Sequence, residues 1–352
     1  MVRKTIAVLY GDGIGPEIMT EAIKVLRIIA KKHDHNFEYR PADFGGVAYD
    51  KHGHPFPPET VKICDEADAI LKGPVGGPKY DRIPDPNLRP EAGAVLPLRK
   101  RYDTFANFRP IKLSSNLIES SPFKPEVIGD GIDLLMIREL TGGVYFGEKV
   151  EDGINEQGYR YARDVMEYTE PQVERIARVA FSEARSKGQK LFNIHKANVL
   201  ACSRFWNKLV NRVHEEFPDV ELEHQLVDSA AFYLEADPRR FNHSVMLLEN
   251  MMGDILTDQA GGILHSLGLM PSACVGSQKA YYEPVHGSAP DIAGKGIANP
   301  YSMIGSAAFM LERSFGLHQE SQEIWDALFT VFDAGYRTRE LVTSSTPPEK
   351  IV

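Results

Sequence analysis

The chain has 352 residues, a formal net charge of −9 and 43% hydrophobic residues. This length suits two domains or one large α/β unit, and the balance of apolar and charged residues is that of an ordinary globular enzyme. The negative charge argues against nucleic acid or a membrane surface as the main partner, although local arginine clusters can still bind an anionic substrate.

The first segment predicts a strand, a turn and a helix. Residues 5–9 form an apolar run typical of a buried strand, and the glycine-rich residues 11–15 follow it. Pro16 and Glu17 suit the first turn of a helix, because proline is tolerated there and an acid favours the positive end of the helix dipole. The apolar residues of 18–29 then recur on one helical face.

Strand-like and helical segments continue to alternate. Residues 69–71 and 191–194 are short apolar runs, and residues 173–184 form an amphipathic helix that Gly188 ends. Such alternation predicts an α/β fold with a largely parallel sheet. The polar segment 147–169 differs, since it predicts a hairpin or arm that completes a partner's sheet, with a solvated loop as the alternative.

The cysteines and the apolar runs bear on the compartment. Cys64, Cys202 and Cys274 are scattered and form no CxxC pair, so reduced thiols are a better interpretation than disulfides or a zinc site. The apolar run at residues 6–10 is too short for a signal-peptide core, and no segment has the roughly 18 apolar residues of a membrane span. We expect a cytoplasmic protein.

An acid pair is the strongest local sign of chemistry. If residues 250–258 open a helix, Asp254 and Asp258 lie four residues apart on one face. Two carboxylates so placed repel each other unless a cation or a base lies between them. Oxygen ligands suit Mg²⁺ or Mn²⁺ better than zinc. The alternative is a solvated helix face that bears two acids.

Three arginines, one tyrosine and one lysine are further candidates. Arginine forks bind carboxylates in a bidentate manner, so Arg99, Arg109 and Arg138 together could hold a dicarboxylate. Tyr145 follows a Gly-Gly turn, and Lys196 ends a short apolar strand, a common location for site residues. Taken singly, each of these five also fits a structural or surface role.

Two loops are candidates for a cofactor site. The turn at 11–15 resembles the GxGxxG fingerprint only in part, because the third glycine is replaced by Pro16 or Ile18, so a Rossmann domain is not predicted. The loop 283–300 is rich in small residues, which allow close approach of the backbone to a ligand. Asp291 would accept hydrogen bonds from ribose hydroxyls and repel a 2′-phosphate, which favours NAD over NADP; an ordinary loop is the alternative.

In chain order, these segments resemble the β-decarboxylating dehydrogenases, and within them the isopropylmalate branch. The resemblance runs nearly from end to end; each short segment alone is moderately specific, whereas the long loop alone is a strong signal. The segments that carry it are GDGIGPE (11–17), GGP (76–78), LRK (98–100), NFRP (107–110), RELTGG (138–143), KANV (196–199), GDILTD (253–258) and the long loop 283–300.

The resemblance implies a two-domain α/β fold that is not a Rossmann fold. Residues 1–104 and 265–352 would form a discontinuous domain that binds NAD, and residues 105–264 would form the second. The second domain would make the interface of an obligate homodimer, with the arm at 147–169, and the active site would lie in a cleft between the domains.

The resemblance also implies site residues. Asp254 and Asp258, with Asp228 of the partner subunit, would hold Mg²⁺ or Mn²⁺ against the substrate. Lys196, also of the partner subunit, would take the hydroxyl proton, and Tyr145 would protonate the enol carbon. The carboxylates of the substrate would be bound by Arg99, Arg109 and Arg138. The residues around NAD would be Ile14, Gly76, Gly77, Glu283, His286, Gly287, Ser288, Ala289, Asp291, Ile292 and Asn299.

The helix before Arg99 indicates the branch. Val95 and Leu96 offer an apolar wall, Val199 of the partner subunit would add to it, and Glu91 would repel a third carboxylate. This wall suits the isopropyl group of 3-isopropylmalate, whose oxidation and decarboxylation to 4-methyl-2-oxopentanoate belongs to leucine biosynthesis. The alternatives are another alkylmalate, D-malate, tartrate or homoisocitrate as substrate, and a catalytically silent regulatory subunit.

Two features depart from the isopropylmalate branch. His195 precedes the expected base, where that branch usually has an acid. The segment 241–250 is about two residues longer than usual, and an insertion of two preserves the alternation of strand faces.

Overall fold

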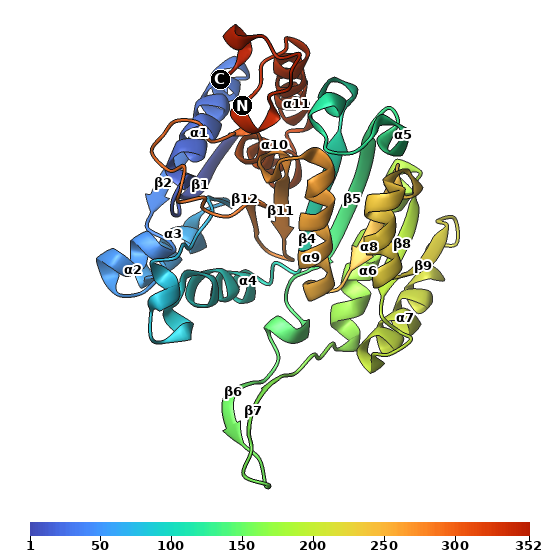
Figure 1. Ribbon diagram of the computed structural model, residues 1–352. Helices are drawn as coiled ribbons and strands as arrows, with labels where there is room; N and C mark the ends of the chain where they lie inside the picture. Colours follow the sequence, from blue (N-terminus) through green and yellow to red (C-terminus); the bar gives the residue numbers. More distant parts are fainter. The chain divides into compact units, whose positions relative to one another are not determined.

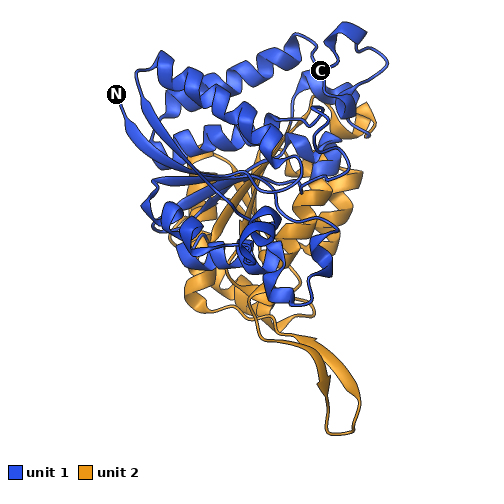
Figure 2. Cartoon of the chain, turned by 90° about the vertical axis from the view of Figure 1, so that its left-hand side faces the viewer, with its two compact units in different colours: residues 1–104, 113–122, 261–352 blue, residues 105–112, 123–260 orange.

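The computed structural model describes residues 1–352, which fold into two compact units (Figures 1 and 2). Unit 1 comprises residues 1–104, 113–122 and 261–352, and unit 2 comprises residues 105–112 and 123–260. The predicted division at residues 104 and 264 stays a prediction about domains, because compactness alone does not show that a unit folds or moves independently.

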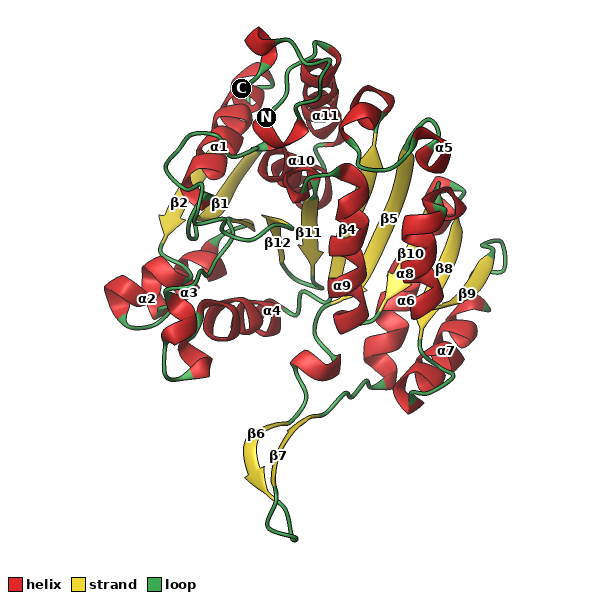
Figure 3. Ribbon diagram, in the orientation of Figure 1, coloured by secondary structure: helices red, strands yellow, loops and turns green.

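The strands of unit 1 pair in the order β2-β1-β3-β12-β11 (Figure 3). β1 is parallel to β2 and β3, β3 is parallel to β12, and β12 is antiparallel to β11. All four residues of β3 are buried, as expected for a strand covered on both faces. The strands are β1 (Arg3–Leu9), β2 (Asn36–Ala42), β3 (Ala69–Lys72), β11 (Pro271–Val275) and β12 (Ala280–Pro284).

Helix α10 packs on β3, β11 and β12 and contacts both α1 and α11. Helix α1 begins at Gly15 with Pro16 in its first turn, and Ile18, Ala22 and Leu26 are fully buried on one face. The helices of unit 1 are α1 (Gly15–Lys32), α2 (Gly46–His52), α3 (Pro58–Glu66), α4 (Leu96–Tyr102), α10 (Tyr301–Phe315) and α11 (His318–Asp333).

The strands of unit 2 pair in the order β4-β5-β10-β8-β9. β10 is parallel to β5 and β8, β8 is parallel to β9, and every residue of β10 is buried. The strands are β4 (Ala106–Leu113), β5 (Ile132–Glu139), β8 (Lys190–His195), β9 (Leu222–Leu226) and β10 (Ser244–Leu248).

Helix α6 packs on β8, β10 and α7. Its ends follow from local chemistry, because Thr169 and Gln172 form a capping box and Gly188 ends the helix in the left-handed conformation. The helices of unit 2 are α5 (Pro125–Ile128), α6 (Glu170–Lys187), α7 (Ala201–His214), α8 (Val227–Ala236) and α9 (Asn250–Gly261).

The segment predicted as a hairpin forms one. β6 (Lys149–Ile154) and β7 (Arg160–Asp164) are antiparallel and form a separate two-stranded sheet (Figure 1). Ile154 and Tyr159 are 72% and 71% exposed. A hairpin with such a surface is only marginally stable alone, which is consistent with the expected role as an arm.

The architecture confirms the predicted α/β class and the exclusion of a Rossmann fold. The strand orders differ from the 3-2-1-4-5-6 order of that fold, and the β11–β12 pair is antiparallel. None of the helices combines the length and the apolar character needed to cross a bilayer.

Candidate active site

Helix α9 carries the acid pair of unit 2. It begins at Asn250, two residues after the buried strand β10, which confirms the predicted helix. Asp254 and Asp258 lie one turn apart, and their side chains are 42% and 53% exposed. Both carboxylates are therefore reachable by a ligand although they belong to a helix that contacts the core.

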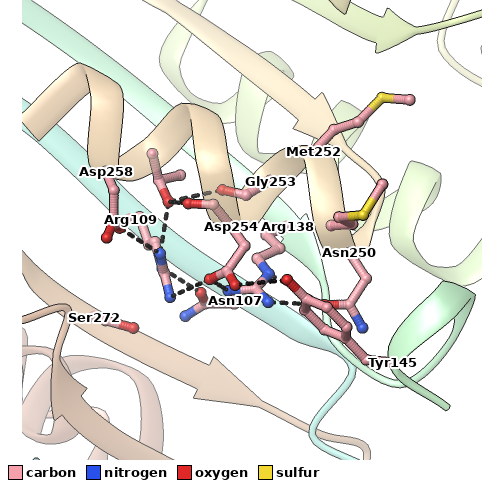
Figure 4. A network of polar contacts seen from close by, with 12 residues as sticks. Asn107, Arg109, Arg138, Tyr145, Asn250, Met252, Gly253, Asp254, Asp258 and Ser272 are labelled. Carbon is pink, nitrogen blue, oxygen red and sulfur yellow. Dashed lines mark hydrogen bonds and ion pairs between the residues drawn. The ribbon is translucent and has the colours of Figure 1, made fainter. Parts of the chain in front are cut away.

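Two buried arginines face these carboxylates (Figure 4). Arg138, at the end of β5, donates from Nη1 to Oδ1 of Asp254. Arg109, on β4, has its Nη1 3.5 Å from Oδ1 of Asp258 and its Nη2 4.0 Å from Oδ1 of Asp254. Arg138 is 1% exposed and Arg109 6%. Charges buried to this degree are retained only when paired, so the acids and the arginines depend on each other.

Two asparagines fix the arginine side chains. Arg109 Nε donates to Oδ1 of Asn107 at 2.7 Å, and Arg138 Nη2 donates to Oδ1 of Asn250 at 2.8 Å. Asn250 in turn donates to the carbonyl of Gly142 at 2.9 Å. The two guanidinium groups therefore have single orientations before any ligand binds, and such preorganisation is what a carboxylate-binding site requires.

Gly253 makes room for Arg138. A Cβ atom at this position would lie 2.6 Å from Cγ of Arg138 and 2.9 Å from its Cβ. Any larger residue here would displace the arginine stem. The glycine of the GDILTD segment is thus explained by close packing on Arg138, since it lies within a helix and needs no positive φ.

Tyr145 belongs to the same network. Its hydroxyl donates to Oδ2 of Asp254 at 2.9 Å, and the guanidinium carbon of Arg138 lies 5.8 Å from its ring centroid. Burial, and then the negative charge of Asp254, raise the pKa of Tyr145 to about 12. The phenol is therefore neutral at physiological pH and can donate a proton.

The negative charge of Asp254 acts on Asp258, its neighbour one turn along the helix. Burial raises the pKa of Asp258; the Arg109 charge lowers it, and the negative charge of Asp254 raises it further. Two half-exposed carboxylates one helical turn apart, of which Asp254 disfavours the ionised form of Asp258, are a donor set that a divalent cation would stabilise, and oxygen ligands fit Mg²⁺ or Mn²⁺. The residues present therefore fit the metal that the sequence predicts.

Lys196 and Asp228 form a second polar group in unit 2. Lys196 follows the last residue of β8, Asp228 lies in the first turn of α8, and Nζ of Lys196 is 2.9 Å from Oδ1 of Asp228. The hydrogen bond from Lys196 is the main cause that lowers the pKa of Asp228. Val199, three residues after Lys196, is 64% exposed.

No group of three or more histidine, cysteine, aspartate or glutamate side chains in the single chain is placed to hold a metal ion. Asp254 and Asp258 contact the arginines, whereas Asp228 contacts Lys196. One chain thus holds two of the three predicted metal ligands in one network and the third in another. The three-aspartate site stays a prediction that involves a second subunit.

Arg99 lies in unit 1, within a buried polar cluster. Its Nε donates to the hydroxyl of Tyr281 at 3.0 Å, and its Nη2 is 4.0 Å from Oε1 of Glu283. Glu283 also forms a short ion pair with Lys72, whose side chain is 2% exposed. Arg99 and Glu283, predicted for the substrate and the cofactor respectively, are therefore neighbours in one cluster.

The predicted cofactor residues of the first loops are brought together in unit 1. The amide of Ile14 donates to the carbonyl of Ser288, and the Ser288 hydroxyl donates to the carbonyl of Gly76, each at 2.8 Å. A Cβ at Gly76 would lie 2.0 Å from Oε1 of Glu91, so Glu91 lies against this loop. A Cβ at Gly77 would have only the Ser288 hydroxyl within 4 Å, at 3.8 Å.

The long loop after β12 presents open backbone. A Cβ at Gly287 would have no atom within 4 Å, and Ala289 adopts a left-handed φ of +39° that is strained for a residue with a Cβ. His286 interacts with the Gly287 carbonyl and with Ser302, and burial lowers its pKa, which favours the neutral ring. An open, strained backbone with small residues fits a nucleotide such as NAD.

Comparison with known proteins identifies the family. The model of the isocitrate/isopropylmalate dehydrogenase family matches residues 5–351. The chain belongs to this family. A 3-isopropylmalate dehydrogenase of Thermotoga maritima is 50% identical over 348 residues, which cover 99% of this chain and 95% of that protein. One of Bacillus subtilis is 47% identical over 344 residues, which cover 97% of this chain and 93% of that protein.

Solved structures agree with the fold of this β-decarboxylating dehydrogenase. An isocitrate dehydrogenase of Methylococcus capsulatus has a TM-score of 0.84 at 32% identity, over 97% of this chain and 95% of that chain. A β-decarboxylating dehydrogenase of Thermococcus kodakarensis has a TM-score of 0.76 at 34% identity, over 98% and 92%. The resemblance inferred from the motifs is thereby confirmed at the level of family and enzyme class.

Several residues of the candidate active site carry no mark of their position there in the sequence. Asn107 precedes Arg109 by two residues on β4, so alternation along the strand places both on one face. The sequence shows this spacing, but only the hydrogen bond between Arg109 and Asn107 shows that the asparagine orients the arginine. Asn250 contacts Arg138, and Lys72 contacts Glu283. Each partner is more than one hundred positions away along the chain, so no local pattern marks either residue.

Proposed function

We propose that the chain oxidises and decarboxylates 3-isopropylmalate to 4-methyl-2-oxopentanoate in leucine biosynthesis, with NAD⁺ and Mg²⁺ or Mn²⁺. One network supports this proposal most. It combines two acids that can bind a metal ion, Asp254 and Asp258, with two arginines that can bind a carboxylate, Arg109 and Arg138, on neighbouring elements. Relatives named 3-isopropylmalate dehydrogenase match over nearly the whole chain, which supports the substrate.

The residues of the site would bind the substrate and transfer two protons. Arg109 and Arg138 bind a substrate carboxylate, for which Arg138 exchanges part of its hydrogen bonding with Asp254. Arg99 is the third carboxylate-binding arginine. Lys196 of the partner subunit accepts the proton of the hydroxyl that is oxidised, and Tyr145, a neutral phenol, returns a proton to the carbon from which CO₂ has left.

The cofactors would occupy the sites that fit them. Asp254 and Asp258, with Asp228 of the partner subunit, would hold the divalent ion, and the long loop with Ile14, Gly76 and Gly77 would surround NAD⁺. When bound, the metal ion polarises the substrate oxygen and NAD⁺ accepts the hydride. Asp291 at the ribose would favour NAD⁺ over NADP⁺.

A homodimer with shared active sites would complete the metal ligands. Apolar side chains are exposed on the helices that carry the acids: Phe232 on α8 is 64% exposed and Ile255 on α9 is 61% exposed. Ile255 lies beside Asp254 in sequence, so a surface that buries it would bring another subunit close to the acid pair.

Three free cysteines suit a reducing compartment, and we assign the enzyme to the cytoplasm.

A substrate panel tests this function. The purified enzyme with NAD⁺ and Mg²⁺ should turn over 3-isopropylmalate faster than D-malate, tartrate, isocitrate or homoisocitrate, because Val95, Leu96 and Val199 of the partner subunit offer an apolar wall. Fastest turnover on isocitrate would contradict the apolar wall. A preference for NADP⁺ would contradict the role of Asp291. Full activity in the presence of a chelator would contradict the metal.

A further inference from the structure

The loop 291–299 has little structure of its own. It contains no helix or strand, and two of its glycines, Gly294 and Gly296, adopt positive φ values of +76° and +64°. The backbone hydrogen bonds of its first half are local, from Ile292 to Ala289 and from Lys295 to Ile292, at 3.1 and 3.3 Å. Such a segment is ordered only if other groups hold it.

One carboxylate holds the middle of this loop. Glu17, in the first turn of α1, accepts hydrogen bonds from the backbone amides of both Gly294 and Gly296, the second at 3.1 Å. Two amides that converge on one carboxylate make charge-assisted bonds, which are stronger than bonds between neutral groups. The anchor belongs to α1, a helix whose opposite face is buried in the core.

The ends of the loop are held separately. Before the loop, the carbonyl of Ser288 accepts the amide of Ile14, and at the end of the loop the Asn299 side chain donates to Glu340 at 2.9 Å and accepts the amide of Tyr301 at 2.9 Å. The segment 288–299 is therefore attached at three points, and Glu17 supplies the middle one, through a side chain of another element. Asp291 lies three residues before the first amide that Glu17 holds.

We propose that Glu17 is a positioning residue for the cofactor: its carboxylate keeps the loop 291–299 in the conformation that binds the nucleotide, and so sets the affinity for NAD⁺ without touching it. This inference rests on the proposed use of NAD⁺. Without Glu17, binding of the cofactor must itself order the loop. The free energy spent on this ordering lowers the apparent affinity for NAD⁺.

The experiment compares three variants of the full enzyme with saturating 3-isopropylmalate and Mg²⁺ and varied NAD⁺. Glu17→Ala should raise the KM for NAD⁺ about tenfold and leave kcat within about twofold, because the reacting groups are unchanged. Glu17→Gln keeps an acceptor oxygen and should raise that KM only about threefold. Neither variant enlarges the side chain, which borders a groove of about 550 Å³.

Glu21→Ala is the matched control. Glu21 lies one turn further along α1, and it pairs with Lys24 at 2.6 Å on the exposed surface. Removal of this acid changes the charge of the helix as Glu17→Ala does, but it frees no loop amide. Its kinetic constants should equal those of the wild type. A similar rise in the KM for NAD⁺ would mean that charge, and not the anchor, sets affinity, and would overturn the proposal.

Amide hydrogen exchange of the enzyme without cofactor gives a readout that does not need activity. Peptides that cover residues 291–299 should exchange faster in Glu17→Ala than in the wild type or in Glu21→Ala, with no change in the rest of unit 1. If the wild type turns over none of the hydroxy-diacids with NAD⁺, the proposed function fails while this measurement still tests the anchor. Unchanged exchange in the loop, or a fall in kcat equal to the rise in KM, would overturn the role of Glu17.

Discussion

The candidate site for chemistry and the candidate site for the cofactor are built on opposite principles. In unit 2, charged side chains project from a helix and from strand ends, and buried partners such as Asn107 and Asn250 fix the two arginines among them. In unit 1, the predicted cofactor residues lie on loops, and what is presented is backbone, held by the side chains of Glu17 and Ser288. Proton transfer needs side chains at fixed points, whereas a nucleotide can be bound largely by main-chain groups.

The largest effect should come from the charged groups of unit 2. Asp254→Ala removes the carboxylate that contacts Arg138 and Tyr145, and turnover should fall at least about a thousandfold, with loss of metal binding. Lys196→Ala should reduce kcat to a similar extent. The lysine variant should nevertheless bind Mn²⁺ and substrate in a titration. Retention of high activity by either variant would refute its catalytic role.

Tyr145→Phe should have the next largest effect. It removes the proposed proton donor and keeps the ring, so kcat should fall about a hundredfold while the KM for substrate changes little. Because the raised pKa of about 12 keeps the phenol protonated, the ratio of wild-type to variant kcat should be the same at about pH 7 and about pH 9. A ratio that collapses toward one at the higher pH would show that Tyr145 ionises there.

Packing around Arg138 should give a smaller effect. Gly253→Ala places a methyl group against the arginine stem, so it should lower the free energy of unfolding by roughly 1–3 kcal/mol and raise the KM for the hydroxy acid. Gly262→Ala is the control, because no atom lies within 4 Å of a Cβ at that position. Denaturant unfolding and steady-state kinetics measure both. Equal stability of the two variants would contradict the packing explanation of Gly253.

The cofactor loop should tolerate change best. Asp291→Ala should lower the discrimination between NAD⁺ and NADP⁺ by about tenfold, because the repulsion of a 2′-phosphate is lost, while kcat with NAD⁺ changes little. The ratio of kcat/KM for the two cofactors measures this effect. An unchanged ratio would mean that a residue other than Asp291 determines the preference for NAD⁺ over NADP⁺.

The contrast between the units also explains what the sequence could predict. Asp254 and Asp258 are one helical turn apart, so their shared face follows from spacing, and the predicted helix is confirmed. The family could be predicted because several motifs occur in a characteristic order along the chain. Glu17 was assigned only to the first turn of a helix, because its partners, Gly294 and Gly296, are about 280 positions away. Contacts across such distances have no local signature in one sequence.

The proposed sharing of the active site between two subunits is the other feature that a single chain does not show. Asp228 pairs with Lys196 and not with the arginines that contact the acid pair, so its proposed role as the third metal ligand rests on the resemblance alone. Exposed Phe232 and Ile255 are individually common on protein surfaces, and they gain weight from their location on the helices that bear the acids.

Mixing two inactive variants tests the shared site most directly. Each active site would combine the acid pair of one subunit with Lys196 and Asp228 of the other. When Lys196→Ala and Asp254→Ala chains are unfolded together, refolded and allowed to pair at random, half of the dimers hold both chains, and one of their two sites is intact. About a quarter of the wild-type activity should therefore return. Mixed dimers that form, as mass spectrometry can verify, but remain inactive would contradict an active site built from two chains.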